Sequence, residues 1–503
     1  MTASGGVMTA RMMNFRFRMA PIRGKGGKKL RKGWIFRVFS LLKCRPSLRL
    51  QESFGMTPHQ LVRRLRYSSW FWLRRAVFWG GAICVGLVAI AFAKTATMAD
   101  DVFHRMLEIS PYLPFLLAPV GLWISLWMTR NVFPGAEGSG IPQAIAAVDM
   151  TDKAARDEVL SLKVAGGKIL LTLLALCCGA SIGREGPTVQ IGAAIMHTLG
   201  KKVRLTRADV QRGLILAGGA AGVAAAFNTP LAGVMFGIEE LSRSFESRTS
   251  GIVVTTVIMG GIISLALLGD YHYFGHTAAT LTFNQAWIGV LVCGVLGGLA
   301  GGIFSQSLVL AGRRGLPGAL GRFRRNHPEH FAALCGLGLA VLGLLSAGGT
   351  YGSGYNQAEA LLHGTSLPVL FAVEKLGATL LSYLSGIPGG IFAPSLAVGA
   401  GIGSDIAMWL PKAPTAALML LGMVGYFSGV VQAPITAVII VLEMTDNSEM
   451  TIWLMATSMI AYGVSHLVCP EPFYKAMAHG FLDKVAASAP KPQPAPEAQA
   501  AES

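Results

Sequence analysis

Three short motifs combine glycine and proline in a pattern that begins a helix and favours an anion. They are GSGIP at residues 138–142, GREGP at 183–187 and GIFAP at 390–394. Proline is tolerated in the first turn of a helix, where its missing N–H is not needed. The free N–H groups of that turn carry a partial positive charge and bind anions without a full cation. The motifs therefore indicate an anion site, although such glycines also serve to let helices pack closely.

The second motif carries two charged side chains, Arg184 and Glu185, between two apolar runs. The overlapping stretch GASIG, at 179–183, also fits the G-x-S-x-G pattern of a serine hydrolase around Ser181. That pattern requires a strand-turn-helix elbow with histidine and acidic partners. Here it lies in a glycine-rich apolar segment, so we disfavour an enzyme and assign no catalytic residue.

The composition that must position these motifs is that of an integral membrane protein. Of the 503 residues, 52% are hydrophobic and only 14% are charged, far from a soluble domain of similar length. Several apolar stretches have the length that crosses a bilayer. They are Ala76–Ala96, Tyr112–Met128, Ile252–Leu268, Ile288–Leu310, Phe331–Ser346 and Thr451–Val468. The apolar pieces between them, broken by Gly and Pro, look too short to cross alone.

The net charge of +17 comes from the N-terminal arm. Residues 1–75 contain 18 Lys and Arg against a single acidic residue, whereas residues 76–503 contain 25 of each sign. A basic arm directly before the first span is the positive-inside signal, so we place the N-terminus in the cytoplasm and the protein in the cell (inner) membrane. The arm lacks the fold and aromatic pattern of a nucleic-acid-binding module, so we expect no nucleic-acid partner.

The chain repeats itself at an offset of slightly more than 200 residues. GSGIPQ at 138 resembles GSGYNQ at 352, and the later matches pair Lys168 with Lys375, Gly179 with Gly386, Pro187 with Pro394, Gly192 with Gly399, Pro230 with Pro434 and Glu239 with Glu443. Ordered matches with a slowly drifting offset indicate two homologous halves. Equivalent segments that are short and interrupted by Gly and Pro predict a transporter-like core with a site near the midplane.

These matches define the expected organisation. A basic arm (1–75) precedes a first membrane repeat (76–270), a connecting loop (271–284) and a second membrane repeat (285–483). Residues 484–503 are rich in Ala and Pro, which predicts a disordered tail. The seven cysteines are scattered without metal-type spacing and are interpreted as small hydrophobes, so we expect no metal and no cofactor.

Together the motifs resemble the signature set of the CLC chloride channels and chloride/proton antiporters. The resemblance rests on GSGIP, GREGP, GGIFAP (389–394) and Tyr474 in the last segment, and covers about residues 76–482. It implies an all-α integral membrane fold with two inverted-topology repeats of broken, tilted helices. It also implies a homodimer with one ion pathway per subunit. We expect a prokaryotic type, without the cytoplasmic nucleotide-sensing modules of eukaryotic members.

The resemblance also implies an anion site. Ser139 and Tyr474 match the residues whose hydroxyls contact the central anion, and Ile391 and Phe392 match positions whose backbone N–H groups face it. A hydroxyl suits this role because it donates a hydrogen bond without a fixed charge that would trap the ion. Taken alone, Ser139 also fits a helix N-cap and Tyr474 an interfacial tyrosine.

Glu185 matches the gating glutamate, whose carboxylate occupies the outer anion position until it is protonated or displaced. Arg184 is interpreted as a helper without ion contact. Lys168, 17 residues before Glu185, is interpreted as a structural or field-setting cation. Where some members carry acidic residues after GSGIP, this chain has Gln143 and Ile145, so an acidic link at the dimer interface is expected to be missing.

Glu240, in GIEEL, matches the glutamate that passes protons on the intracellular side in antiporters, where channels usually have a non-acidic residue. An ionisable residue inside a membrane protein is costly and is commonly a proton relay. The repeat pairs its neighbour Glu239 with Glu443, which indicates a structural role for both. The expected function is chloride transport across the lipid bilayer by chloride/proton antiport. A passive voltage- or pH-gated chloride channel on the same fold, and transport of another halide or nitrate, remain as alternatives.

Overall fold

The computed structural model describes residues 58–205, 207–242, 247–269 and 272–488. The expected arm up to residue 57 and the expected tail from residue 489 lie outside the described residues. The chain divides into two units, Met1–Trp70 and Phe71–Ser503. Of the first unit, the structure describes only the beginning of helix α2. The second unit contains the rest of α2 and the helices that follow it.

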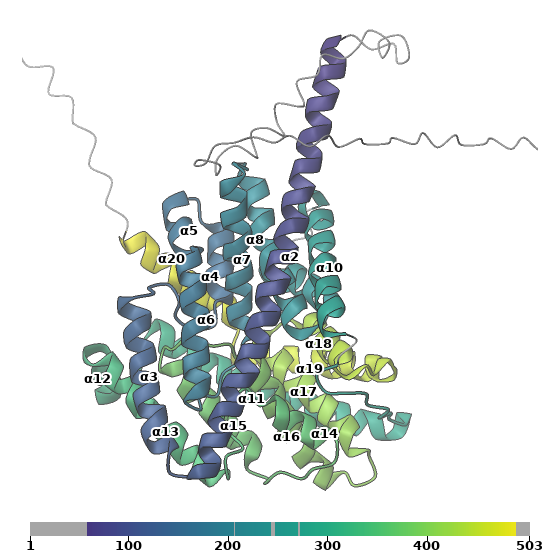
Figure 1. The fold of residues 1–503 in the computed structure, drawn as a ribbon. Helices are drawn as coiled ribbons and strands as arrows, with labels where there is room; N and C mark the ends of the chain where they lie inside the picture. Colours follow the sequence, from purple (N-terminus) through teal and green to yellow (C-terminus); the bar gives the residue numbers. More distant parts are fainter. Residues whose placement is uncertain (1–57, 206, 243–246, 270–271, 489–503) are drawn as a thin grey trace, which may run out of the picture. The chain divides into compact units, whose positions relative to one another are not determined.

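Helices, without a strand, make up the described part of the chain (Figure 1). The first half contains α2 (Pro58–Ile109), α3 (Pro114–Asn131), α4 (Ile141–Asp149), α5 (Lys153–Val159), α6 (Leu162–Cys177), α7 (Glu185–Lys202), α8 (Ala208–Phe227), α9 (Pro230–Phe236), the π-helical turn η2 (Gly237–Ser242) and α10 (Ser247–Leu268). The second half contains α11 (Phe283–Arg313), α12 (Gly318–Asn326), α13 (Pro328–Leu345), α14 (Tyr355–Leu362), α15 (Phe371–Leu384), α16 (Phe392–Trp409), α17 (Thr415–Val431), α18 (Pro434–Thr445), the 3-10 turn η3 (Ser448–Met450), α19 (Thr451–Val468) and α20 (Phe473–Ser488).

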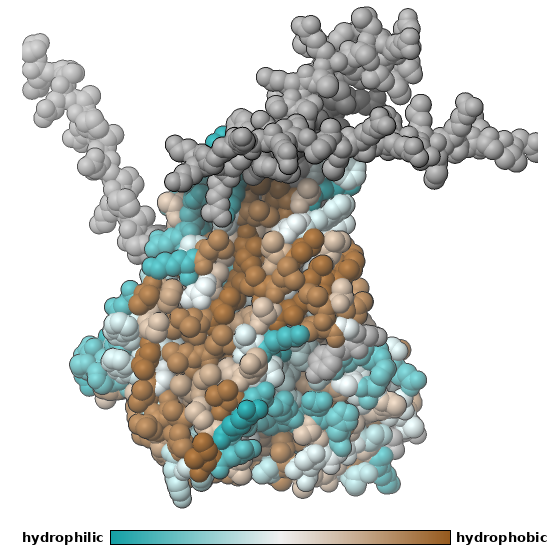
Figure 2. Space-filling view, viewed as in Figure 1, coloured by the Kyte–Doolittle hydropathy of each residue, from teal (hydrophilic) through white to brown (hydrophobic). Residues whose placement is uncertain are grey.

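Six segments of the described residues are long and apolar enough to cross a membrane. They are Arg75–Ile109, Lys153–Cys177, Ala208–Phe227, Trp287–Arg313, Pro328–Leu345 and Ser448–Val468. The second and third are not among the stretches that the sequence predicts to cross, because the glycines in them lie inside helices instead of ending them. The predicted stretches Tyr112–Met128 and Ile252–Leu268 are not among these six segments. On the face shown in Figure 2, hydrophobic side chains form a broad region over the helices, as contact with lipid requires.

The two halves repeat the same backbone conformation at equivalent residues. Gly140 before α4 and Gly354 before α14 have φ angles of 98° and 87°. At the ends of α8 and α17, Asn228 and Gln432 both have a φ of 57°, a left-handed conformation that costs an ordinary residue roughly 1–2 kcal/mol. The similarity in sequence is therefore also a similarity in backbone, and the predicted internal repeat is confirmed.

Gly183 and Gly390, which are equivalent in the two halves, exchange two backbone hydrogen bonds. The N–H of each donates to the carbonyl oxygen of the other, at 2.7 Å in both directions. Reciprocal contact between equivalent residues is what a two-fold axis produces. The helices that start just after them, α7 and α16, therefore run in opposite directions across this axis. The halves are inverted repeats, as the family resemblance implies.

Glycines bring the central helices of each half into direct backbone contact. Helix α7 meets α8 at Gly192, where an added Cβ would lie 2.2 Å from the carbonyl oxygen of Gly218. The equivalent contact joins α16 to α17, where a Cβ on Gly422 would lie 2.3 Å from the carbonyl oxygen of Gly399. No side chain fits at either crossing, so small residues hold α7 and α16 in place. These two helices begin at the candidate site.

Candidate functional site

The three glycine and proline motifs meet in space. In addition to the exchange between Gly183 and Gly390, the N–H of Gly389 donates to the carbonyl oxygen of Gly138 at 3.1 Å. Helices α4, α7 and α16 begin two or three residues later, each with a proline in its first turn. Their first N–H groups have no partner within the helix. The predicted helix starts are confirmed, and three anion-favouring helix ends are joined by one set of loops.

Two buried hydroxyls lie at this junction. Ser139, in the first loop, lies against Gly186 of α7, where an added Cβ would be 2.5 Å from the serine Oγ. Tyr474, on α20, is fully buried, with its phenol close to the Ser139 hydroxyl. Among the described residues, neither oxygen has a hydrogen bond of good geometry. Since a buried hydroxyl without a partner costs stability, this pair is suited to a ligand that accepts hydrogen bonds.

Ile391 and Phe392 are the N-cap and the first residue of α16, and both are buried. The Phe392 ring packs edge-on against Phe427, with centroids 4.8 Å apart, and lies 5.9 Å from the ring of Tyr474. This packing holds the Phe392 side chain in place. The backbone N–H groups, which need no polar side chain, are then the only donors these residues contribute.

Glu185 is the first residue of α7 and is fully buried. Its Oε1 accepts a hydrogen bond of 2.6 Å from the hydroxyl of Tyr355, and Arg184 Nε lies 3.9 Å from the same oxygen. Its Oε2 is buried without a hydrogen-bond partner among the described residues. A Cβ on Gly183 would lie 2.2 Å from this Oε2, so the glycine leaves the space that the carboxylate fills.

Arg184 is committed to protein contacts. Its guanidinium donates to the carbonyl oxygen of Ala93 at 2.6 Å, to Thr97 Oγ1 at 2.8 Å and to the Tyr273 hydroxyl at 2.9 Å. It also lies 5.4 Å from the ring centroids of both Tyr273 and Tyr355. These contacts agree with the expected role of a helper that orients the loop.

Lys168 and Lys375, equivalent in the repeat, are fully buried and hold the loops before α4 and α14. Lys168 Nζ donates to the carbonyl oxygen of Glu137 at 3.1 Å and to Gln190 Oε1 at 2.8 Å. Lys375 Nζ donates to three successive carbonyl oxygens, those of Thr350, Tyr351 and Gly352. Each lysine thus fixes the backbone of a glycine-rich loop in its own half.

Glu240 lies in the π-helical turn η2 and is buried. Tyr474 is within electrostatic reach of both Glu240 and Glu185. Turns of π-helix are frequent at functional sites. Both expected proton-handling carboxylates therefore lie near the Tyr474 phenol.

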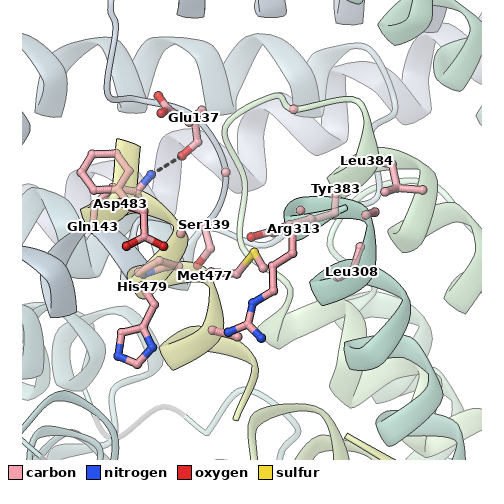
Figure 3. Close-up of a pocket in the computed structure, with 18 of the residues that line it drawn as sticks. Glu137, Ser139, Gln143, Leu308, Arg313, Tyr383, Leu384, Met477, His479 and Asp483 are labelled. Carbon is pink, nitrogen blue, oxygen red and sulfur yellow. Dashed lines mark hydrogen bonds between the residues drawn. The ribbon is translucent and has the colours of Figure 1, made fainter. Parts of the chain in front are cut away.

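Two hollows approach the junction. The larger, of about 690 Å³, is lined by Ser139, Gln143, Tyr383, Arg313 and His479, among others (Figure 3). The Gln143 amide donates to the carbonyl oxygen of Glu137 at 2.7 Å. The smaller hollow, of about 80 Å³, is lined by Tyr355 and Arg184 together with Asp100, Tyr273, Asn356 and Glu359. Glu185 lines neither hollow, but Tyr355, which donates a hydrogen bond to it, lines the smaller one.

Ser181 has no place in this chemistry. It is fully buried, and its hydroxyl is hydrogen-bonded to Thr379 Oγ1 at 3.0 Å. Its backbone N–H donates to Ser382 Oγ at 3.0 Å. The G-x-S-x-G match therefore lies on a turn between helices α6 and α7, not on the strand-turn-helix elbow that a hydrolase requires.

Comparison with known proteins identifies the family. Residues 120–466 match the voltage gated chloride channel family, Voltage_CLC. The H(+)/Cl(-) exchange transporter ClcA of Vibrio cholerae serotype O1 is 31% identical over 425 residues, which cover 80% of this chain and 88% of the relative. The chain belongs to the CLC family. The relative named above is described as a transporter.

Solved CLC structures share the fold. A slow cyanobacterial Cl-/H+ antiporter superposes with a TM-score of 0.68 at 25% identity, covering 82% of this chain and 98% of the other. A CLC-type fluoride/proton antiporter gives 0.66 at 23% identity, with 80% and 98% covered. A eukaryotic CLC transporter gives 0.68 at 19% identity, with 82% and 74% covered. The last two show the shared fold alone. The expected all-α, multi-pass membrane fold is confirmed.

Tyr355 is the residue at this CLC site that the sequence analysis does not single out. It follows GSG in the second-half copy of the first motif, at the place where the first half has Ile141. The repeat marks the loop but not the tyrosine. The sequence signal for this residue is that the second-half loop has a hydroxyl-bearing aromatic residue where the first-half loop has an apolar one.

Proposed function

We propose that this CLC protein exchanges chloride for protons across the membrane. The observation that carries the proposal is the position of Glu185, a fully buried carboxylate at a helix N-terminus where the three loops meet. A carboxylate resembles an anion at a site made of N–H donors, so the ionised side chain competes with chloride for that site. Protonation removes the charge and the competition. One group then responds to both ions, which is what coupled exchange requires.

Chloride occupies the junction of the three loops. The hydroxyls of Ser139 and Tyr474, both buried and without a well-formed hydrogen bond among the described residues, donate to it, and so do the backbone N–H groups near Ile391 and Phe392. None of these donors carries a full charge. The anion is therefore attracted strongly enough to enter and weakly enough to leave.

Glu240 exchanges protons between Glu185 and the cytoplasm. It is buried, acidic and within electrostatic reach of Tyr474, next to the anion site. Buried acids in membrane proteins commonly form proton relays. The relatives named as H(+)/Cl(-) or Cl-/H+ exchangers support antiport, as does the acid at this position.

The assembly and orientation belong to the same proposal. We place the basic N-terminal arm on the cytoplasmic side of the cell (inner) membrane, following the positive-inside rule. The junction of loops and both proton-handling glutamates come from one chain, which supports one pathway per subunit. A homodimer, as the family resemblance implies, would then contain two such pathways.

Flux measurements in liposomes test the function. Purified protein is reconstituted with an imposed chloride gradient and no pH gradient, and proton movement is followed with a pH electrode. We expect protons to move uphill, driven by chloride. Chloride flux without proton movement would instead indicate a passive channel, and preferential flux of fluoride or nitrate in the same assay would change the assigned anion.

A further inference from the structure

The Tyr355 hydroxyl makes the single hydrogen bond that the described residues provide to the Glu185 carboxylate. The donor and acceptor oxygens are 2.6 Å apart, and both side chains are buried. Among the described residues, the other carboxylate oxygen has no hydrogen-bond partner, and Arg184 Nε lies 3.9 Å from the bonded oxygen, beyond hydrogen-bond distance. The position of the carboxylate therefore depends on one phenol.

Neighbouring side chains hold the Tyr355 ring in place. The residue opens helix α14 directly after Gly354, whose φ is 87°. Its ring stacks on Tyr273 with centroids 5.2 Å apart and an interplanar angle of 26°, and lies 5.9 Å from Phe274. Arg184 lies over the same ring. Because the ring cannot turn without disturbing these contacts, its hydroxyl presents a fixed donor.

Tyr355 also separates Glu185 from the smaller hollow. The tyrosine lines that hollow with Asp100, Arg184 and Glu359, whereas the carboxylate has no exposed surface. A carboxylate leaving the outer anion position must break its bond to the phenol, and a proton arriving from this side must pass the same group. The hydroxyl is thus placed to control both events.

We infer that Tyr355 is a positioning residue that holds Glu185 in the outer anion position through its hydroxyl and so limits the rate of exchange. The inference rests on the proposed gating role of Glu185. A hydrogen bond to an ionised group is stronger than one between neutral groups. Losing it frees the carboxylate to leave its position more often and favours the protonated form.

Other ionisable side chains surround this pair on several elements. They are Arg184 at the start of α7, Asp100 and His104 on α2, Glu359 on α14, Lys375 on α15, Tyr273 before α11, Tyr474 on α20 and Glu240 in η2. A Tyr355→Phe substitution changes none of them and keeps the stacked ring. A changed dependence on external pH would therefore report the lost hydroxyl.

The test compares Tyr355→Phe with Tyr462→Phe in liposomes. Tyr462→Phe removes a phenol hydroxyl from α19, where the ring stacks on His466 and lines neither hollow. For Tyr355→Phe we expect chloride turnover to rise on the order of tenfold, the proton-to-chloride ratio to fall, and the external-pH profile of transport to move to higher pH. For Tyr462→Phe we expect the wild-type ratio and pH profile. Wild-type turnover, ratio and profile in Tyr355→Phe would overturn the inference.

A second background separates this inference from the proposed function. Glu185→Ala removes the carboxylate, so adding Tyr355→Phe to it is expected to change neither chloride turnover nor the pH profile further. An effect of Tyr355→Phe that persists without the carboxylate would overturn the inference and leave the gating role intact. If Glu185→Ala itself retains wild-type coupling, the proposed function fails, whatever the tyrosine variant does.

Discussion

Glu239 and Glu443 form a reciprocal pair of helix caps. Glu443, on α18, accepts from backbone N–H groups at the start of α9, and Glu239, just after α9, accepts from those at the start of α18. The two helices therefore lie antiparallel, each capped by a carboxylate from its counterpart. The bonds join Glu443 to Leu231 N (3.1 Å) and Ala232 N (2.7 Å), and Glu239 to Ile435 N (3.2 Å), Thr436 N (2.7 Å) and Thr436 Oγ1 (2.7 Å).

Neutralising either cap should lower stability. Glu239→Gln and Glu443→Gln each remove a negative charge from a helix N-terminus, and we expect a loss of about 1 kcal/mol for each. The measurement is the midpoint of thermal unfolding in detergent. Glu158→Gln is the control, since Glu158 is exposed and lies at the C-terminal end of α5. Equal midpoints for the cap variants and the control would contradict the structural role.

Glu185→Gln should uncouple the two ions. The amide keeps the size of the side chain but cannot take up or release a proton, so chloride flux continues while proton flux falls below detection. Parallel recordings of chloride efflux and proton uptake in liposomes test this expectation. Glu108→Gln, at an exposed position on α2, should behave as wild type. Persistent uphill proton movement in Glu185→Gln would argue against the gating role.

Two adjacent glutamates provide a matched pair for the proton pathway. Glu240→Gln should suppress proton movement and leave chloride flux, because the relay acid is lost while the anion site remains. Glu239→Gln should lower the unfolding midpoint but keep the wild-type proton-to-chloride ratio. The assignment of the relay to Glu240 would be wrong if the two variants exchanged these effects.

The two buried hydroxyls should contribute directly to anion affinity. Ser139→Ala and Tyr474→Phe each remove one donor to chloride, and we expect about tenfold weaker binding for each. Isothermal titration of chloride into detergent-solubilised protein measures the affinity. Ser125→Ala is the control, since Ser125 on α3 is also a buried hydroxyl without a partner among the described residues but lies outside the junction of loops.

Gly186 should tolerate no side chain. An added Cβ would lie 2.5 Å from Ser139 Oγ and 3.2 Å from the Cα of Gly390, so Gly186→Ala forces two of the three loops apart. We expect a chloride flux below a tenth of the wild-type value in protein that still purifies as a folded species. Gly166→Ala on α6, where nothing lies within 4 Å of an added Cβ, should transport normally.

The repeat allowed much of the fold and site to be predicted from sequence. Equivalent glycines and prolines mark equivalent helix starts. Glycine readily adopts the left-handed conformation before a helix, and proline suits the first turn. Glu239 and Glu443 could be paired for the same reason. Which helix end each glutamate caps could not be predicted from sequence, because that depends on how the two halves pack.

Tyr355 shows where the pattern gives no information. Its partner Glu185 is 170 residues away, and no local rule connects a tyrosine after GSG with a carboxylate in the other half. The sequence also does not predict α8 as a membrane-spanning helix, since glycines interrupt this apolar stretch. In the structure some of these glycines allow close contact with neighbouring helices, and tertiary packing outweighs their low helix propensity.

The reciprocal bonds between Gly183 and Gly390 have a consequence for the direction of transport. Two identical loops around a two-fold axis would form a pore with equivalent entrances, unable to treat its two ends differently. At equivalent places two residues further on, one loop has Glu185 and the other has Phe392. The preceding position also differs, with Arg184 in one loop and Ile391 in the other. Under the proposed mechanism these differences give one end a titratable carboxylate and the other an aromatic side chain. Asymmetry between the faces of the membrane then arises from divergence within a duplicated loop.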